Sequence, residues 1–320
     1  MKFTQFSALL LALLASTAFA QTWPDKPVRL VLSQPPGSGP DNIARILSDS
    51  LTRKMGQSIV VDNKPGGQNA IGAQNAARSP ADGYTFYLAT TAALVTNAYL
   101  FKSLPYDPQK DFAPVGFIGK SPFAILVEAN SPIKSIQDLL GRAKAEPGKV
   151  SIANEGPKTF SGMIARLLNA RANLDTNLVP YVSIAAAVQD TLGGRVDVLV
   201  ADVASTAQFV KQGRLRMIAV TSPKRIEGWE QVPALAEVVP GFDMVGWMAV
   251  VAPVGTPPQI VQRMNRELDA ALLDKEVAGK IHNVGPISEG AGTPEQLGEF
   301  LRSEHKRWAE ITKEIGVLPE

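Results

Sequence analysis

The chain has 320 residues, a hydrophobic fraction of 45%, a formal net charge of +2 and no cysteine. A chain of this length buries a large core without disulfides, and the lack of cysteine excludes thiol catalysis, iron–sulfur clusters and thiolate zinc sites. Its Lys and Arg residues are scattered and its net charge is near zero, so neither nucleic acid nor an anionic membrane is an expected partner.

Residues 1–20 have the pattern of a secretory signal peptide. Lys2 supplies the positive n-region, residues 7–15 form a short apolar segment, and Ala18-Phe19-Ala20 is a small-residue cleavage site. The apolar segment is too short to span a bilayer. We therefore expect cleavage after Ala20 and a mature protein in the periplasm, with a buried N-terminal helix as the alternative.

Strand-like apolar runs alternate with amphipathic helical patterns along the mature chain. We expect strands at 28–32, 58–62, 84–90, 123–127, 150–153, 178–179, 196–201 and 217–221. We expect helices at 41–55, 70–78, 135–145, 159–170, 184–192, 256–273 and from 293 onward. This alternation is typical of α/β architecture, with mostly parallel sheets flanked by helices.

The length favours two domains. Two stretches are typical of crossings between lobes, one near Gly119–Pro122 and one near Thr221–Arg225. We expect a first lobe made of residues 21–122 and 225–320, and a second lobe made of residues 123–224. Two such lobes place the carboxyl ends of their strands on a shared cleft, and hinge motion closes the cleft around a ligand.

Two glycine-rich loops, Pro35–Pro40 and Pro65–Gly72, each follow a strand and precede a helix. Backbone N–H groups at such junctions are unpaired and lie at the positive end of a helix dipole, so they form anion sites. Gly66 and Gly67 favour positive φ, which arranges successive N–H groups as a nest. A plain connecting turn and a dinucleotide site are the alternatives for the first loop, although Asn42 replaces the third glycine of the dinucleotide fingerprint.

The sequence lacks the usual hydrolytic and metal-binding patterns. Its two histidines, His282 and His305, have no metal-ligand spacing, and His305 falls in a charged helical stretch where we expect a solvated face. Ser131–Lys134 matches the S-x-x-K pattern, but Pro132 breaks the helix that such a nucleophile needs. We expect Trp247 in the core. The residues thus predict no catalytic group, no metal and no cofactor.

Several motifs follow one another through nearly the whole mature chain. They are WPDKPVR from Trp23, PPGSGPD from Pro35, DNKPGGQNAIGA from Asp62, LPYDPQKDF from Leu104 and GGRVD from Gly193. In this order they resemble the Bug (TctC-like) family, the extracytoplasmic solute receptors of tripartite tricarboxylate transporters. The resemblance implies a two-lobed Venus-flytrap protein, not an enzyme, that binds a small mono- or dicarboxylate and works as a monomer with transporter membrane subunits.

By position, the resemblance implies ligand contacts from both lobes. In the family, two loops of the first lobe hold one carboxylate of the ligand, largely through backbone N–H groups and ordered water. The first-lobe residues implied are Gly37, Ser38, Gly39, Pro40, Asp41, Gly67, Gln68, Asn69, Ala70, Thr90 and Thr91. The second-lobe residues implied are Gly156, Pro157, Lys158, Thr159, Phe160, Ile184, Ala185 and Asp202.

The far half of the pocket departs from the family pattern. Lys158 stands where glycine is typical, Gly162 stands where histidine is common, and Val182-Ser183 replaces Lys-Gly. Lys158 favours a second anionic group on the ligand, and Phe160 favours an aromatic ring. Three functions stay open: a transport receptor, a receptor that reports to a signalling partner and, more distantly, a nucleotide-using enzyme.

Overall fold

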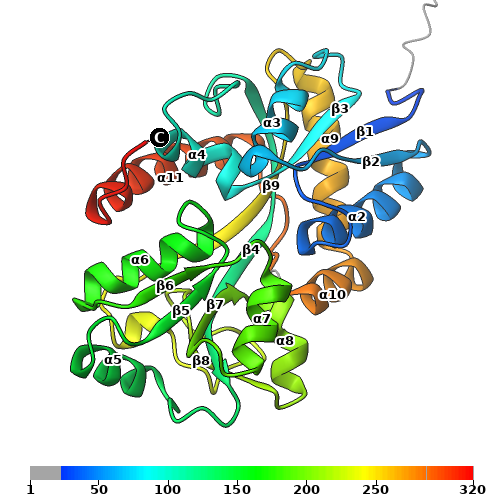
Figure 1. Ribbon diagram of the computed structural model, residues 1–320. Helices are drawn as coiled ribbons and strands as arrows, with labels where there is room; N and C mark the ends of the chain where they lie inside the picture. The colour runs from blue at the N-terminus through cyan, green and yellow to red at the C-terminus, as the bar shows by residue number, and fades with distance from the viewer. Residues whose placement is uncertain (1–22, 286, 320) are drawn as a thin grey trace, which may run out of the picture.

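The structure is a computed structural model that describes residues 23–285 and 287–319. The expected signal peptide, residues 1–20, lies outside the described residues. Among the helices that the structure describes, none combines the length and the apolar character that crossing a membrane requires. Figure 1 shows two lobes, with strands β4 (Phe112–Glu128) and β9 (Val245–Pro253) running between them.

In the described part of the chain, a nine-stranded sheet has eight strands in the order β2-β1-β3-β9-β4-β7-β5-β6, and the ninth, β8, pairs with β4 off this path. The other strands are β1 (Val28–Leu32), β2 (Ile59–Asn63), β3 (Thr85–Thr90), β5 (Ser151–Asn154), β6 (Asn177–Pro180), β7 (Val198–Asp202) and β8 (Leu215–Val220). The α-helices are α2 (Gly39–Met55), α3 (Ala70–Ala77), α4 (Asn97–Leu100), α5 (Ile136–Ala145), α6 (Phe160–Ala172), α7 (Ile184–Leu192), α8 (Val203–Lys211), α9 (Pro258–Leu272), α10 (Lys275–Val284) and α11 (Pro294–Glu314). Short non-α turns of helix are η1 (Gly67–Asn69), η2 (Ala92–Thr96) and η3 (Leu235–Glu237).

The first lobe is built on β1, which lies parallel to β2 on one side and to β3 on the other. Antiparallel β9 and the first part of β4 extend this sheet. Side chains of a strand alternate between the two faces of its sheet. Leu30 and Leu32 therefore pack with α2, α9 and α10 on one face, whereas Val31 packs with α3 and α11 on the other.

The second lobe repeats this arrangement. Parallel strands β7, β5 and β6 join the second part of β4, which pairs antiparallel with β7 and β8. Ile152 and Val198 face α5 and α6, while Ala153 and Leu199 face α7 and α8. Each sheet is thus covered by helices on both faces, so the open positions in each lobe are the ends of its strands.

β4 carries the chain from the first lobe to the second. Pro122 pairs with Val245 of β9, whereas the next residue, Phe123, pairs with Asp202 of β7. We propose this step as the first boundary between the lobes.

The segment that follows residue 225 packs against the second lobe. Ile226, Val232 and Ala234 pack in the apolar cluster of the second lobe, and the Met244 N–H donates to the Thr221 carbonyl at 3.0 Å. Prolines interrupt this segment, so its apolar residues form no periodic pattern that would indicate a helix or a strand. We therefore propose that the second lobe extends to Met244.

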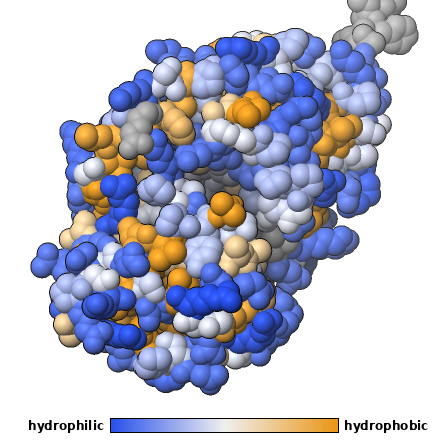
Figure 2. Space-filling model, in the orientation of Figure 1, coloured by the Kyte–Doolittle hydropathy of each residue, from blue (hydrophilic) through white to orange (hydrophobic). Residues whose placement is uncertain are grey.

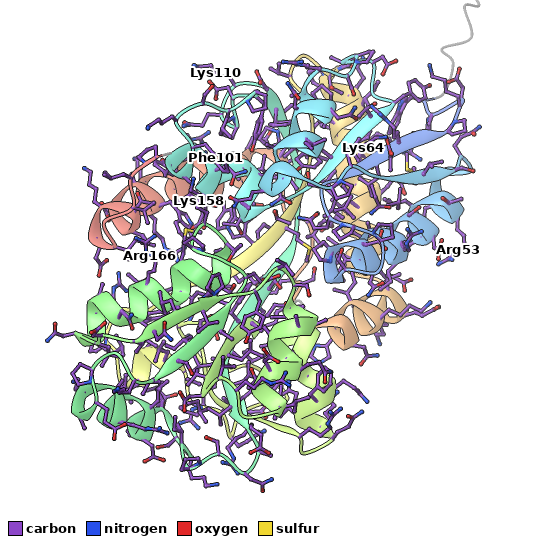
Figure 3. The ribbon with its side chains drawn as sticks, viewed as in Figure 1. Arg53, Lys64, Phe101, Lys110, Lys158 and Arg166 are labelled. Carbon is purple, nitrogen blue, oxygen red and sulfur yellow. The ribbon has the colours of Figure 1, made fainter. Side chains whose placement is uncertain are left out.

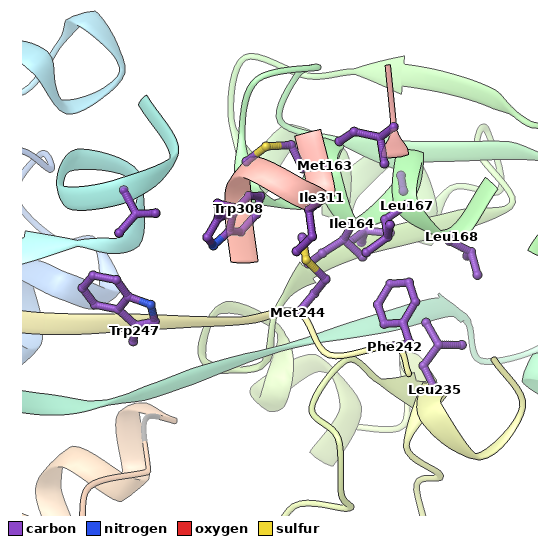
Figure 4. Close-up of a cluster of buried hydrophobic side chains, with 14 of the residues drawn as sticks. Met163, Ile164, Leu167, Leu168, Leu235, Phe242, Met244, Trp247, Trp308 and Ile311 are labelled. Atoms are coloured by element: carbon purple, nitrogen blue, oxygen red, sulfur yellow. The ribbon is translucent and has the colours of Figure 1, made fainter. Parts of the chain in front are cut away.

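The last helix, α11, is a third connection between the lobes, in addition to β4 and β9. Figure 4 shows Trp308 and Ile311 of α11 against Met163 and Ile164 of α6. The end of α11 is also joined to α6 by an ion pair of 2.8 Å between Arg171 and Glu314. The hinge therefore consists of two strands and the second half of a helix.

The expectation of a solvated His305 is wrong. His305 on α11 is 6% exposed, and the Tyr99 hydroxyl donates to its carbonyl at 2.7 Å and lies 3.2 Å from its Nδ1. Because α11 packs against both lobes, its buried face is wider than a single apolar stripe and includes polar residues. The expectation for Trp247 is confirmed: it is 3% exposed, and its Nε1 donates to the Glu304 carboxylate at 2.8 Å.

Candidate ligand-binding cleft

The carboxyl ends of the parallel strands face each other across the junction of the two lobes. In the first lobe, Thr90 at the end of β3 pairs with Met248, which pairs with Gly119 of β4. In the second lobe, Asp202 at the end of β7 pairs with Phe123 of β4. Four residue steps separate Gly119 from Phe123, about 13 Å of extended strand. Figure 2 shows a hollow between the lobes, and the strand spacing suits a small molecule.

The turn after β2 has an unusual backbone. Gly66, Gly67, Gln68 and Asn69 all have positive φ, at 120°, 55°, 49° and 77°. This conformation is costly for Gln68 and Asn69, and such strain persists mainly at functional sites. Residues 67–69 form a short turn of helix, and the first N–H groups of a helix have no partner within it. The N–H of Ala70 is not part of this group because it donates to the Gly67 carbonyl.

Three hydrogen bonds from neighbouring elements hold this turn in place. Asn97 donates to the Gln68 carbonyl at 2.8 Å, and the Ser33 hydroxyl donates to the Asn69 carbonyl at 3.0 Å. Gln34 donates to the Asn69 side chain at 2.7 Å. The sequence analysis missed Asn97, although a buried amide in the apolar run AALVTNAYL is the kind of signal that marks a positioning residue.

The first glycine loop is used differently from the expectation. Its Gly37 N–H donates to the Asp41 carboxylate at 2.8 Å, and its Ser38 N–H donates to the Pro35 carbonyl at 3.3 Å. Both amides are therefore paired within the protein. Asp41 is 1% exposed, so its carboxylate holds the loop from the protein interior. The sequence pattern did not reveal that an acidic residue in the first turn of the helix accepts a hydrogen bond from a loop N–H group.

Asp41 also links the first loop to β2. Besides Gly37, its carboxylate accepts hydrogen bonds from Arg45 at 2.9 Å and from Asn63 at 2.9 Å. Burial alone would raise the pKa of Asp41, but the hydrogen bonds from Arg45, Gly37 and Asn63 together lower it. The carboxylate therefore stays ionised and fixes the entrance to α2.

Gly39 is the residue of this loop that leaves room for a ligand. It begins α2, where N–H groups have no partner within the helix. A Cβ atom placed on Gly39 would meet no protein atom within 4 Å, and its φ lies outside the left-handed region. Pro40 follows and has no N–H to offer. The loop thus presents Gly39 as its available donor.

The two threonines at the end of β3 differ in their use. The Thr91 hydroxyl accepts the Trp247 N–H at 2.9 Å and donates to the Trp247 carbonyl at 3.3 Å, which ties β3 to β9. The Thr90 hydroxyl is buried and has no hydrogen-bond partner among the described residues. The Thr90 hydroxyl is therefore available to bond a ligand, whereas the Thr91 hydroxyl holds β3 to β9.

In the second lobe, three helices begin beside one another because their strands are neighbours in the sheet. Thr159 caps α6 by accepting the Gly162 N–H, and Ser183 caps α7 in the same way. Asp202 caps α8 by accepting the Ser205 N–H at 2.8 Å. The other expected residues of this lobe lie at the same helix starts: Pro157, Phe160, Ile184 and Ala185.

The loop between β5 and α6 folds tightly against the helix. Gly156 is buried with φ of 122°, and its N–H donates to the Asn154 side chain at 2.8 Å. A Cβ atom on Gly162 would lie 1.9 Å from the Gly156 carbonyl oxygen. The space near residue 162 is therefore filled by backbone, and a larger residue there is incompatible with this loop.

Glu155, which the sequence analysis did not single out, lies at the end of β5 near Asp202. Loss of hydration raises the pKa of Glu155, and the neighbouring Asp202 raises it further, although Glu155 retains contact with solvent. Burial also raises the pKa of Asp202 despite its hydrogen bonds from Ser205. Both carboxyl groups therefore hold their protons to a higher pH than free carboxyl groups do.

Lys158 makes a contact between the lobes. Its ammonium nitrogen lies 5.0 Å from the centre of the Phe101 ring, which follows α4 in the first lobe. Figure 3 shows the two side chains meeting between α4 and α6. Within the residues described, no group of His, Asp or Glu side chains has an arrangement that suits a metal ion.

The sequence matches the family described as "Tripartite tricarboxylate transporter family receptor" over residues 43–317. The chain belongs to this family. The resemblance that the motifs indicated is thereby confirmed. The tripartite tricarboxylate receptors are solute-binding proteins and not enzymes, which agrees with the absence of catalytic patterns in the sequence.

The chain is 36% identical over 313 residues to a UPF0065 protein in the tcbD-tcbE intergenic region of Pseudomonas sp. strain P51, covering 96% of this chain and 93% of that one. It is 32% identical over 305 residues to protein BugT of Bordetella pertussis, covering 95% and 93%. The solved structure of R. palustris Rpa4515 with adipate has a TM-score of 0.86 and 30% identity, covering 93% and 100%. Periplasmic binding protein BugD has a TM-score of 0.82 and 29% identity, covering 93% and 100%. These likenesses confirm the two-lobed α/β fold.

Proposed function

We propose that this protein is a periplasmic receptor that captures a small organic carboxylate in its cleft and delivers it, as a monomer, to the membrane subunits of a tripartite transporter. Membership of the receptor family supports the transport role. A relative with 30% identity and nearly full coverage has adipate bound, which supports the carboxylate class. The signal-like residues 1–20 support export.

The observation that carries this proposal is the turn at Gly66–Asn69. Its four consecutive positive φ angles and its position after β2 of the first sheet support a backbone anion site there. Backbone donors bind a carboxylate without adding a charge of their own, so they suit many acids. We assign the carboxylate clamp to the N–H groups of Gly39, Gly67, Gln68 and Asn69 and to the Thr90 hydroxyl.

A thermal-shift panel tests the carboxylate class. A ligand that binds only the folded protein stabilises it by about 2.7 kcal/mol at a concentration one hundred times its Kd. We expect at least one acid among short aliphatic, aromatic and amino carboxylates to raise the Tm of the mature protein. The matching primary amides are the controls, because they keep the shape and lose the charge. Equal shifts with acids and amides, or no shift with any acid, would contradict the proposal.

Delivery to a transporter needs a separate test. We expect deletion of the gene to abolish uptake of the radiolabelled acid identified by the panel, and a plasmid copy to restore it. Unchanged uptake together with a lost transcriptional response to that acid would instead favour the signalling receptor.

A further inference from the structure

Two unpaired polar side-chain atoms lie at the carboxyl edge of the first sheet, beside the turn at Gly66–Asn69. β1 and β3 are parallel neighbours in which Leu32 pairs with Leu88, and Gln34 and Thr90 follow these leucines by two residues each. The side-chain oxygen of Gln34 (Oε1) and the Thr90 hydroxyl are both buried and have no hydrogen-bond partner among the described residues. A buried polar atom without a partner costs free energy. Two such atoms at one edge of a sheet indicate a group from outside the protein that pairs with them.

Hydrogen bonds from two neighbours fix the position of Gln34. Its Nε2 donates to the Asn69 side chain at 2.7 Å, and its backbone carbonyl accepts a hydrogen bond from Asn63 at 3.0 Å. The amide nitrogen is therefore in use, and the amide oxygen is the atom that is left unpaired. An amide oxygen accepts hydrogen bonds and donates none, so it needs a donor on the ligand and does not bind a carboxylate.

The surroundings of Gln34 indicate whether this donor is charged. Asn63 donates both to the Gln34 carbonyl and to the Asp41 carboxylate, so Asp41 is a close neighbour. Asp41 is already paired with Arg45 at 2.9 Å and provides no counter-charge for an ammonium group of a ligand. Burying an unpaired charge is costly, whereas a neutral hydroxyl pairs with a neutral amide oxygen without that cost. The donor that suits Gln34 is therefore a hydroxyl.

We propose that the ligand is a 2-hydroxycarboxylate, and that Gln34 selects it by accepting a hydrogen bond from the hydroxyl on the carbon next to the carboxylate. This inference rests on the proposed function, since the carboxylate itself is bound at the Gly66–Asn69 turn and by Thr90. Neighbouring strands lie about 4.8 Å apart, a spacing that suits polar groups on adjacent carbon atoms. A site with such a hydrogen bond rejects the analogue that lacks the hydroxyl, because the Gln34 oxygen then stays unpaired.

Matched sets of ligands test this inference by isothermal titration calorimetry of the mature protein. Each set contains a 2-hydroxy acid, the parent acid without the hydroxyl and the 2-amino acid. The sets are lactate, propanoate and alanine; 2-hydroxybutanoate, butanoate and 2-aminobutanoate; 2-hydroxyglutarate, glutarate and glutamate; and mandelate, phenylacetate and phenylglycine, with both enantiomers titrated. We expect the hydroxy acid of at least one set to bind roughly tenfold or more tightly than its two analogues, a difference of about 1.4 kcal/mol.

The variant Gln34→Met keeps a side chain of similar length and removes the amide oxygen. We expect it to reduce the preference for the hydroxy acid over the parent acid roughly tenfold. The variant also loses the hydrogen bond from Gln34 to Asn69, and the parent acid reports on that loss because it uses the same carboxylate clamp. Gln137→Met, at an exposed position of α5, is the matched control and leaves both affinities unchanged.

The outcomes separate the two proposals. If the natural protein binds the parent acids or the amino acids as tightly as the hydroxy acids, this inference is overturned and the carboxylate receptor stands. Equal weakening of the hydroxy acid and the parent acid in Gln34→Met also overturns it, because Gln34 would then only position the turn. Failure of every acid in all the sets to bind contradicts the proposed function itself.

Discussion

The ammonium of Lys158 lies against the Phe101 ring, at 5.0 Å from its centre, and the two residues belong to opposite lobes. A cation–π contact at a partly exposed position contributes about 0.5–1 kcal/mol. Because the partners meet only when α4 and the loop before α6 approach each other, this contact stabilises the arrangement in which the lobes touch. We expect it to lengthen the time for which the two lobes stay together around a ligand.

Replacing Phe101 with Leu is expected to release the ligand roughly two to five times faster, which corresponds to loss of that contact. The conservative variant Phe101→Tyr keeps an aromatic face and is expected to release it at the natural rate. Stopped-flow displacement followed by tryptophan fluorescence measures the rate. Equal rates for Phe101→Leu and the natural protein would show that the contact does not hold the lobes.

Asn97 is expected to act as a positioning residue for the strained turn. Asn97→Ala removes the donor to the Gln68 carbonyl and is expected to weaken carboxylate binding roughly five- to tenfold, or about 1–1.4 kcal/mol. Calorimetry with the acid found in the panel measures the loss. Asn42→Ala, at an exposed position of α2, is the control.

Tyr106→Phe provides a milder version of the same test. It removes the hydroxyl that donates to the Ala93 carbonyl at 2.7 Å and lies 3.4 Å from the Asn97 amide. We expect a smaller loss of affinity than in Asn97→Ala. If Asn97→Ala folds and binds the acid as tightly as the natural protein, Asn97 does not position the turn for binding.

Gly162→Ala is expected to destabilise the protein by about 1–3 kcal/mol, because the added Cβ overpacks the Gly156 carbonyl. Urea unfolding measures the change. Gly141→Ala in α5 is the matched control, since its Cβ meets nothing within 4 Å, and it is expected to leave stability unchanged or raise it by up to about 1 kcal/mol. Similar stability of Gly162→Ala and the natural protein would mean that the loop before α6 moves freely.

The buried His305 predicts how stability depends on pH. Burial lowers the pKa of His305 below its usual 6.5, with Leu94, Asp107 and Glu304 opposing that shift. The unfolded chain therefore binds a proton more readily than the folded protein as the pH falls below 6.5. The contribution is fully present above that pH and is lost as the pH falls through the folded pKa.

The variant His305→Gln tests this dependence. Urea unfolding between pH 8 and pH 5 is expected to show the free energy of unfolding decreasing more steeply in the natural protein than in His305→Gln. Parallel curves for the two proteins would show that His305 is not the group responsible.

Most elements could be predicted from the sequence because their periodicity and caps are local. Ser135 caps α5 and Thr293 caps α11, as the patterns indicated. The helices α4, α8 and α10 and the strand β9 were not expected. All nine residues of β9 are buried, so it has no alternating pattern to detect. Its antiparallel pairing with β4 could not be predicted either, because it depends on where two distant crossings meet.

The sequence predicted the backbone conformation of one candidate loop, whereas the hydrogen bonds of the other loop depend on a pairing that the pattern did not reveal. The turn at Gly66–Asn69 has the positive φ angles that its glycines suggested. The first loop differs because Asp41 pairs with Gly37, a choice that local pattern does not show. Glu155 was not singled out because a lone acid after a strand is unremarkable until β7 brings Asp202 beside it.

The most direct test of the central claim compares Gly39→Val with Gly141→Val by calorimetry of carboxylate binding. Both positions begin or lie within a helix, and a Cβ atom added at either meets no protein atom within 4 Å, so both variants are expected to fold. If the cleft holds the carboxylate against the backbone at Gly39, Gly39→Val weakens binding roughly a hundredfold, about 2.7 kcal/mol, while Gly141→Val binds normally. Undiminished affinity in a folded Gly39→Val protein would contradict the account.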